Sequence, residues 1–221
     1  MVTYQNILFD LDGTLTDPKV GITKAVQHAL AKFDIIEPDL TKLNFFIGPP
    51  LEVTFMETYS FSRDKAWEAI GYYREYFKEH GIYENELYAG IPELLEVLKS
   101  QGRSLFVATS KPYVFAETIL SHFQLDSYFT YVCGSELDGT RSDKSEIIQY
   151  IIENYQLNVE DTIMIGDRKH DIHGAHNNNI HSVGVGFGYG TEEEITAARP
   201  TIQVKTVQEL FQVFSMVEIA R

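Results

Sequence analysis

Short apolar runs alternate with helical segments in the later part of the chain, and this alternation limits the possible folds. Residues 104–109 (SLFVAT), 161–167 (DTIMIGD) and 181–187 (HSVGVGF) are mainly apolar, and segments with helical spacing lie between them. Strands without polar alternation are covered on both faces, which is typical of a parallel sheet flanked by helices. Residues 5–9 form a similar run and are expected in the same sheet, because a lone strand is not stable. The sequence therefore predicts an α/β fold.

A long stretch without convincing strands follows the first strand. Helical patterns occupy three segments of it, at residues 21–33, about 51–59 and 63–79. We therefore expect a Rossmann-like parallel core formed by residues 1–16 and 82–221, with a small all-helical domain, residues 17–81, inserted after the first strand. An insertion at this point lies beside the carboxyl edge of the sheet, where open α/β folds bind their ligands.

Some helix ends are marked by residues suited to capping. Asp143 with Glu146, and Thr206 with Glu209, have the spacing of capping boxes and are expected to begin two helices. Asparagine tolerates positive φ, so the last residues of the NNN run at 177–179 are expected to end the helix before the final predicted strand.

The composition excludes several classes of protein. The chain has 221 residues, 44% of them hydrophobic, and a formal net charge of −14. An acidic surface without a Lys/Arg stripe repels nucleic-acid phosphates, so we expect no nucleic-acid partner. Cys133 is the only cysteine, which fits a reducing compartment. We find no signal-peptide pattern and no apolar run near the ~20 residues of a membrane helix. These features predict a cytoplasmic protein with no membrane partner, and leave monomer and homodimer equally open.

Polar side chains stand where the predicted strands end. They are Asp10 and Asp12 after the first strand, Thr109 and Ser110 at the second, and Asp167 and Asp171 after the strand at 161–167. Lys144 opens the helix that precedes the last of these strands. The carboxyl ends of parallel strands lie at one edge of a sheet, so these residues are expected to surround one crevice.

This set of side chains is suited to a metal ion and a phosphoryl group. Clustered carboxylates repel one another unless a cation lies among them, and Mg²⁺ is bound by carboxylate and phosphate oxygens. A cation, a lysine, hydroxyl groups and backbone N–H groups together suit a phosphoryl group. Asp10 and Asp12 are two residues apart, so they point to the same side of an extended segment. One can attack phosphorus while the other delivers a proton to the leaving oxygen.

Four segments resemble, in order and spacing, the four motifs of the haloacid dehalogenase-like superfamily of phosphatases. They are DLDGTLTD (10–17), VATSKP (107–112), DKSEII (143–148) and IGDRKHDI (165–172). The resemblance covers essentially the whole chain and implies that the helical insertion is the small cap of that superfamily. IGPPL (47–51) and GFGYG (186–190) are similar to the phosphoglycolate phosphatase-like branch, which also contains bacterial 5′-nucleotidase-like members. We expect the GFGYG segment to be a loop flanking the crevice.

The resemblance implies a role for each polar residue. Asp10 would be the nucleophile and a Mg²⁺ ligand. Asp12 would be the general acid and then the base, and would give its backbone carbonyl to the metal. Lys144 would neutralise phosphate charge and steady Asp10. Asp167 would bind the metal, and Asp171 would act on it through water or orient Lys144. The remaining implied phosphate-binding residues are Gly13, Thr14, Thr109, which would hold the transferring phosphoryl group, and Ser110.

The activity implied is Mg²⁺-dependent hydrolysis of a small phosphorylated metabolite through an aspartyl-phosphate intermediate, of the phosphoglycolate phosphatase type. Three alternatives stay open: a 5′-nucleotidase, a sugar-phosphate mutase, and a non-catalytic regulatory module that binds a phosphorylated metabolite. Phosphoglycolate, nucleoside monophosphates and sugar phosphates are all compatible with the residues.

Several single residues allow two interpretations. Lys111 is a rival of Lys144 for the phosphate lysine, although the motif favours Lys144. Arg74 could reach a substrate carboxylate or base, but packing within the insertion is the simpler reading. Asp17, past the turn, is expected to be structural. Three histidines at helical spacing could suggest zinc, but they more simply line a partly exposed helix face: His170, His173 and His176.

Overall fold

The computed structural model describes residues 4–215, and this part of the chain divides into two units. The first, which we call the core unit, contains the described residues up to Thr16 and those from Leu87 onward. The second, which we call the inserted unit, is the segment Asp17–Glu86. The sequence predicts an insertion of residues 17–81, and the second unit spans Asp17–Glu86.

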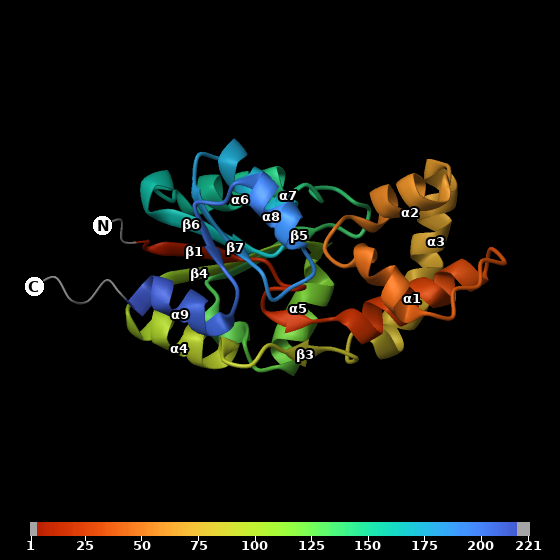
Figure 1. Cartoon of the computed structure of the whole chain (residues 1–221), viewed down its shortest axis with the longest axis horizontal. Coiled ribbons are helices and arrows are strands. Elements are labelled where there is room, and N and C mark those ends of the chain that lie inside the picture. Colours follow the sequence, from red (N-terminus) through yellow and green to blue (C-terminus); the bar gives the residue numbers. More distant parts are fainter. Residues whose placement is uncertain (1–3, 216–221) are drawn as a thin grey trace, which may run out of the picture. The chain divides into compact units, whose positions relative to one another are not determined.

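A six-stranded parallel sheet forms the centre of the core unit (Figure 1). Its strands, in spatial order, are β5 (Tyr131–Ser135), β4 (Ser104–Pro112), β1 (Asn6–Phe9), β6 (Thr162–Gly166), β7 (His181–Val185) and β8 (Ile202–Val204). Leu8 of β1 lies in register with Phe106 on one side and Met164 on the other. The predicted parallel α/β sheet is confirmed, and the first strand of the chain lies in its middle.

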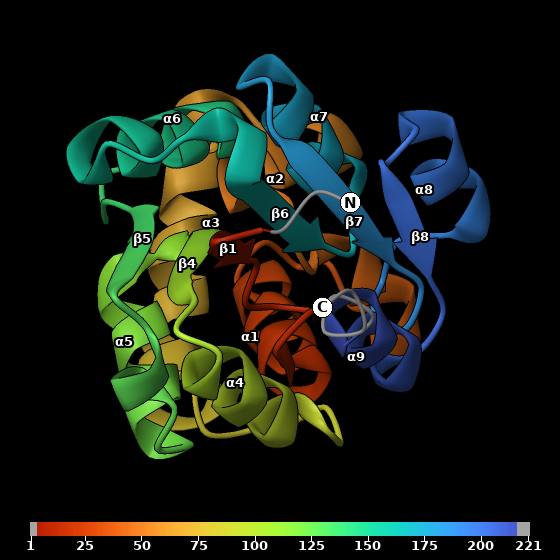
Figure 2. The same ribbon diagram turned by 90° about the vertical axis from the view of Figure 1, so that its left-hand side faces the viewer.

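Helices cover both faces of this sheet, as Figure 2 shows. One face carries α6 (Lys144–Tyr155), α7 (Lys169–Asn177) and α8 (Glu192–Ala198). The other carries α4 (Ile91–Ser100), α5 (Tyr113–His122) and α9 (Val207–Ser215). Short 3-10 turns, η3 (Asp126–Tyr128) and η4 (Val159–Asp161), precede β5 and β6. Among the described residues, no helix is long and apolar enough to cross a membrane.

The apolar runs of the sequence become the core because neighbouring strands are buried on both sides. Leu8, Phe106 and Met164 are at most 1% exposed, and they share one cluster with Ile148 and Ile151 of α6. Burial of a side chain of this size stabilises the fold by roughly 1.5–3 kcal/mol. The absence of polar alternation in β1, β4 and β6 is therefore the direct consequence of their two covered faces.

Side chains cap the helices at the positions that the sequence predicted. Asp143 is the N-cap of α6 and accepts the N–H of Ser145 at 2.8 Å, not that of Glu146, so the helix begins as predicted but without the predicted bond to Glu146. Thr206 accepts the N–H of Glu209 at the start of α9 at 3.1 Å, and the Glu209 carboxylate accepts the N–H of the residue before Thr206. Asn179 has φ of 56°, so it is the left-handed residue just after α7.

The inserted unit is helical, as expected. Its elements are α1 (Lys19–Ala31), η1 (Leu40–Phe46), α2 (Leu51–Tyr59), α3 (Arg63–Tyr76) and the π-helical turn η2 (Phe77–Gly81). Aromatic rings fill its interior: Phe46 and Phe55 lie 4.8 Å apart between ring centroids, and Phe55 stacks on Phe61 at 6.1 Å. Two short strands, β2 (Thr16–Asp17) and β3 (Glu86–Leu87), pair where the chain passes between the units.

Two elements extend differently from the sequence prediction. The helix expected over 63–79 ends as an α-helix at Tyr76, and the backbone continues through one π-helical turn to Gly81. The strand expected over 104–109 continues to Pro112, with a shift of register against β5. The π-helical turn lies where Gly81 contacts Gly21 of α1, and the extension of β4 lies where its register against β5 shifts. A local sequence pattern does not show either feature.

Three short elements had no clear signal in the sequence. β8 has three residues, too few to show a period, and α8 opens with the run Glu192–Glu194, which has no apolar spacing. The 3-10 helix η1 has seven residues, of which only Leu43 and Phe46 are buried. Side chains nevertheless cap two of them: Thr191 accepts the N–H of Glu194 at the start of α8 at 3.1 Å, and Asp39 accepts the N–H of Thr41 at the start of η1 at 3.0 Å.

Candidate active site

The polar residues predicted to share a crevice lie at the carboxyl ends of neighbouring strands. Asp10 directly follows β1, Thr109 lies in the last part of β4, and Asp167 directly follows β6. Since β4, β1 and β6 are adjacent in the sheet, these residues are brought to one edge of the core unit. The backbone N–H of Asp10 donates to the Ile165 carbonyl of β6 at 2.9 Å, which ties the ends of the two strands together.

Lys144 occupies the centre of the site with all of its donors engaged. Its side chain is 4% exposed, and its Nζ lies 2.7 Å from Asp10 Oδ1, 2.6 Å from Asp171 Oδ1 and 2.8 Å from the Ala108 carbonyl. An ammonium group has three N–H donors, so three acceptors use its full capacity. Burial by itself would lower the pKa of Lys144, but the two carboxylates raise it above its ordinary value. The lysine is therefore charged and rigidly held.

Three carboxylates gather around this lysine. One oxygen from each of Asp10, Asp167 and Asp171 lies within 4.8 Å of the others, and all three residues are buried. Burial and then the Asp171 and Asp10 charges hold the pKa of Asp167 well above its usual range. Burial also raises the pKa of Asp171 to about 6, although Lys144 opposes that shift. One lysine does not balance three carboxylates.

The donor set fits a hard divalent cation. Among the described residues, Asp167 Oδ1 is buried and has no hydrogen-bond partner. A buried carboxylate oxygen without a partner is costly unless something positive lies beside it. Mg²⁺ is held by carboxylates of this kind. Of the four aspartates that the sequence assigns to a metal, Asp10, Asp167 and Asp171 have carboxylate oxygens close enough together to bind one ion.

The loop after β7 closes one side of the carboxylate group. The N–H of Tyr189 donates to Asp167 Oδ2 at 2.6 Å, so the GFGYG segment does lie beside the site as predicted. Gly13 faces the same carboxylate from the other side: its φ is +85°, and a Cβ at this position would collide with the Asp167 side chain. A glycine is therefore required at position 13 on both conformational and steric grounds.

Asp12 is paired with the second lysine of the site. Lys111 Nζ lies 2.5 Å from Asp12 Oδ2, and the two side chains are 6% and 8% exposed. Burial raises the pKa of Asp12, and Lys111 opposes that shift. Asp12 Oδ1 is buried and has no hydrogen-bond partner in the described part of the chain. The sequence presented Lys111 and Lys144 as rivals, whereas the structure places both at the site, each on a different aspartate.

Hydroxyl groups expected to bind phosphate lie at the same strand ends. Thr14 and Thr109 are buried, and Thr14 Oγ1 has no hydrogen-bond partner among the described residues. Thr109 Oγ1 accepts the N–H of Lys111 at 3.3 Å. Ser110 is partly exposed, and its carbonyl accepts the Ser135 hydroxyl at 3.0 Å. Thr14 thus carries a fully buried hydroxyl beside the predicted phosphate-binding residues.

The residues with two interpretations take structural positions. Asp17 Oδ1 accepts the N–H of Lys19 at the start of α1, at 3.0 Å. The Arg74 guanidinium lies 5.7 Å from the centroid of the Trp67 ring, inside the inserted unit. His173 and His176 of α7 are exposed and His170 is half-buried. Within residues 4–215, the grouping with metal-ligand proximity consists of the three aspartates described above.

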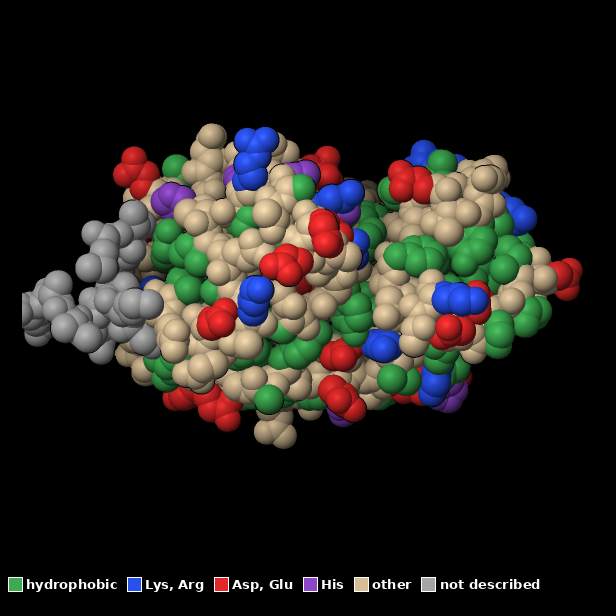
Figure 3. Space-filling model, viewed as in Figure 1, with side chains coloured by type: hydrophobic (Ala, Val, Ile, Leu, Met, Phe, Trp, Pro, Cys, Tyr) green, Lys and Arg blue, Asp and Glu red, His purple; other side chains and the backbone are tan. Residues whose placement is uncertain are grey.

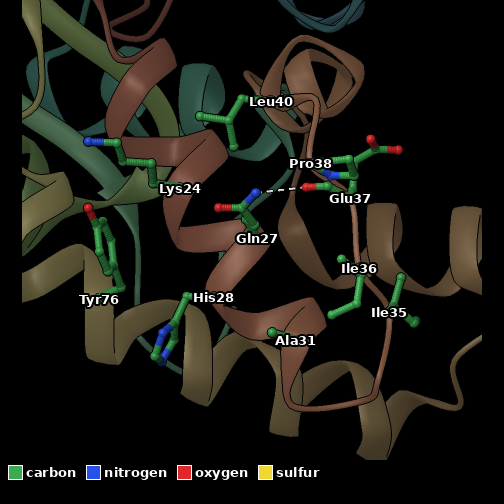
Figure 4. A pocket seen from close by; sticks show the side chains of 10 residues that line it. All are labelled: Lys24, Gln27, His28, Ala31, Ile35, Ile36, Glu37, Pro38, Leu40 and Tyr76. Carbon is green, nitrogen blue, oxygen red and sulfur yellow. Dashed lines mark hydrogen bonds between the residues drawn. The ribbon is translucent and has the colours of Figure 1, made fainter.

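The inserted unit has a cavity of its own. Apolar atoms gather at the surface of this unit in Figure 3, and Ile36, which is 77% exposed, lines a cavity of about 590 Å³ (Figure 4). Its polar side chains are partnered: Lys24 pairs with Glu84 at 2.5 Å, and Gln27 donates to the Glu37 carbonyl at 2.7 Å. The full lining is Lys24, Gln27, His28, Ala31, Ile35, Ile36, Glu37, Pro38, Leu40 and Tyr76. This cavity contains no carboxylate set like that of the core unit.

Comparisons with known proteins show the family to which the chain belongs. A family model described as haloacid dehalogenase-like hydrolase matches residues 7–185. The chain is 53% identical over 210 residues to a 5′-nucleotidase from Pseudomonas aeruginosa, with 95% of each chain covered. It is 35% identical over 208 residues to tyrosine-protein kinase PtkA from Mycobacterium tuberculosis, covering 93% of this chain and 71% of that protein. A crystal structure of a predicted phosphatase from Clostridium acetobutylicum has a TM-score of 0.95 at 49% identity, covering 97% and 100% of the two chains.

Proposed function

The chain belongs to the haloacid dehalogenase-like hydrolases, and we propose that it hydrolyses small phosphomonoesters with Asp10 as the nucleophile. The observation that supports this most directly is the buried, charged Lys144 held between Asp10 and Asp171. An enzyme that forms an aspartyl-phosphate needs one carboxylate kept ionised and fixed in direction. Lys144 places a positive charge 2.7 Å from Oδ1 of Asp10 and fixes the direction of that side chain.

The first step transfers the phosphoryl group to Asp10. Oδ1 of Asp10 accepts hydrogen bonds from Lys144 and from the N–H of Leu11 at 2.7 Å, so Oδ2 is the oxygen directed at phosphorus. The new bond joins Asp10 to phosphorus while the bond from phosphorus to the leaving oxygen breaks. Asp12 gives its proton to that leaving oxygen. The phosphoryl oxygens would be bound by the hydroxyl groups of Thr14, Thr109 and Ser110.

The second step regenerates the enzyme. Asp12, now ionised, takes a proton from a water molecule, and the water oxygen attacks phosphorus. The bond between phosphorus and Asp10 breaks, so inorganic phosphate leaves and Asp10 is a carboxylate again. Lys144 holds Asp10 in one place throughout, which favours the in-line geometry of both steps.

The residues present would hold Mg²⁺ with the carboxylates of Asp10, Asp167 and Asp171 and the backbone carbonyl of Asp12. When bound, the ion supplies positive charge that offsets both the repulsion among the carboxylates and the charge of the phosphoryl group. The unpartnered Asp167 Oδ1 supports this assignment. The orientation of Lys144 by Asp171, one of the two roles expected for that residue, is consistent with their 2.6 Å separation.

Replacement of the nucleophile tests the proposal. We expect Asp10→Asn to lower p-nitrophenyl phosphate hydrolysis by about 10³-fold or more, because an amide oxygen does not form the acyl-phosphate. Wild-type activity should depend on added Mg²⁺. Asp64→Asn, a change of the same kind at an exposed position of α3, is the matched control and should keep wild-type activity. Equal activity in wild type and Asp10→Asn would refute the proposal.

A 5′-nucleotidase is the second candidate, supported by the name of the relative that shares 53% identity with this chain. Comparison of kcat/KM for nucleoside 5′-monophosphates, 2-phosphoglycolate and sugar phosphates separates it from a phosphoglycolate phosphatase. Isomerisation of a sugar phosphate faster than its hydrolysis would indicate a mutase. Tight binding of a phosphorylated metabolite without turnover of any substrate would indicate a non-catalytic module.

A further inference from the structure

The two lysines of the site differ in what they are able to do. Lys144 uses all three donors on Asp10, Asp171 and the Ala108 carbonyl, so it cannot turn toward another group without releasing one of them. Lys111 instead contacts Asp12, the residue that carries the proton in the proposed reaction. The nucleophile and the acid therefore have separate cationic partners.

The backbone around Lys111 is shaped to bring its side chain to Asp12. β4 continues beyond Thr109 as far as Pro112, and its register against β5 shifts between Ala108 and Pro112. Such irregularities redirect side chains and are frequent beside active sites. The segment is also fixed: the Ser110 carbonyl accepts the Ser135 hydroxyl, and the N–H of Lys111 donates to Thr109 Oγ1.

The Lys111–Asp12 ion pair is buried, and it involves only one of the two carboxylate oxygens of Asp12. Both side chains are less than one-tenth exposed, and the ammonium binds Oδ2 at 2.5 Å. Oδ1 is equally buried and has no hydrogen-bond partner within the described residues. Because the ion pair with Lys111 fixes Oδ2, the buried Asp12 carboxyl cannot rotate freely, and its Oδ1 points in one direction. Removal of the Lys111 ammonium group would leave both Asp12 oxygens without this partner, so the carboxyl group could rotate.

We propose that Lys111 is a positioning residue that holds the Asp12 carboxyl so that Oδ1 faces the leaving oxygen of the substrate. The inference rests on the proposed phosphatase reaction and adds a residue to it. Lys111 then matters for protonation of the leaving group, and Lys144 matters for attack by Asp10. The two lysines should therefore be separable by the chemistry of the leaving group.

Two substrates of similar shape make that separation measurable. p-Nitrophenolate leaves readily without a proton, whereas the phenolate of phenyl phosphate is a stronger base and depends on the acid. A well-placed general acid contributes about 10²–10⁴-fold to such a step. We expect Lys111→Met to lower kcat/KM, which reports the step that expels the leaving group, at least about 10-fold more for phenyl phosphate than for p-nitrophenyl phosphate. Lys144→Met should lower both equally, because attack by Asp10 is common to both.

Lys205→Met is the matched surface control, because Lys205 pairs with Glu192 and both side chains are about 70% exposed. It should behave as wild type with both substrates. Lys111→Arg keeps a cation at the pair and should recover part of the selective loss. If Lys111→Met does not fold, as judged by its thermal unfolding transition, Lys111→Gln replaces it with the same expectation. Equal losses on the two substrates in the Lys111 variants would overturn the inference.

A structural readout keeps the inference separate from the proposed function. In a crystal structure of Lys111→Met, the Asp12 carboxyl should have rotated away from its wild-type position. An unmoved carboxyl would overturn the role of Lys111 whether or not the protein hydrolyses phosphate esters. A wild-type protein that hydrolyses neither substrate, combined with a rotated Asp12, would refute the phosphatase proposal and retain Lys111 as the residue that positions Asp12.

Discussion

At the scale of single residues, the site is organised by pairs of opposite charge. Asp10 and Asp12 are two positions apart, yet Asp10 is held by Lys144 and Asp12 by Lys111. Two buried carboxylates so close in the chain repel each other unless positive charge lies beside them. A separate cation for each aspartate is compatible with the proposed division of roles, in which Asp10 attacks phosphorus and Asp12 carries the proton.

The thiol of Cys133, by contrast, is made unreactive by burial. Its thiol is 1% exposed, and burial raises its pKa to about 11. We expect no reaction with 5,5′-dithiobis(2-nitrobenzoic acid) in the native protein at about pH 8, because the thiolate is the reactive form. Addition of denaturant should release one reactive thiol per chain, measured by absorbance. Rapid reaction of the native protein would contradict this prediction, because it would show that β5, which contains Cys133, is exposed to solvent by local unfolding.

At the scale of elements, α1 approaches the π-helical turn η2 so closely that only a glycine fits at position 21. A Cβ at Gly21 would collide with the Gly81 carbonyl, and the N–H of Gly21 donates to the Glu84 carbonyl at 3.0 Å. The π-helical turn that interrupts the predicted 63–79 helix is thus part of the contact with α1 within the inserted unit.

This contact predicts the effect of a single methyl group. Gly21→Ala should lower the free energy of unfolding by roughly 1–3 kcal/mol, the usual cost of overpacking a rigid contact. Gly71→Ala is the matched control, because nothing lies within 4 Å of a Cβ at that position of α3. It should stabilise by about 0.5–1 kcal/mol through helix propensity. Urea unfolding measures the free energy of unfolding of both variants. Similar effects of Gly21→Ala and Gly71→Ala would contradict the close contact between Gly21 and Gly81.

At the scale of the whole molecule, the proposed Mg²⁺ site predicts that the stability of the protein depends on Mg²⁺. Mg²⁺ at ten times its Kd should add about 1.4 kcal/mol to the free energy of unfolding, which for a chain of this length raises the unfolding temperature by about 3–6 °C. Asp167→Asn should lose most of this gain. Added KCl of the same ionic strength is the control, and equal unfolding temperatures with and without Mg²⁺ would argue against a metal site here.

The same carboxylates give this effect a pH dependence. The pKa of Asp171 is about 6 in the folded protein and 3.8 as the ordinary value, so the folded state binds more protons between these values. In the metal-free protein, its contribution to stability therefore decreases as pH rises through this window. Metal binding competes with the protons. The rise in unfolding temperature with Mg²⁺ should accordingly be larger at about pH 7 than at about pH 5.

Much of the fold could be predicted because its signals are local. The apolar runs become β1, β4, β6 and β7, and Asp143 and Asn179 stand at the helix ends that their chemistry indicates. The set of residues at the sheet edge could be predicted too, because parallel strands end on one side. Short elements such as β8 escaped prediction, since three residues show no period.

The sequence by itself determined the α/β class, the insertion after the first strand and the identity of the polar residues at the strand ends. These depend on the order and spacing of residues along the chain. Only the tertiary structure decided that Lys111 pairs with Asp12, since these two residues are 99 positions apart in the chain. It also placed the Tyr189 N–H on Asp167 and the Gly21 backbone against Gly81. Such contacts join distant segments through packing, and no local pattern encodes them.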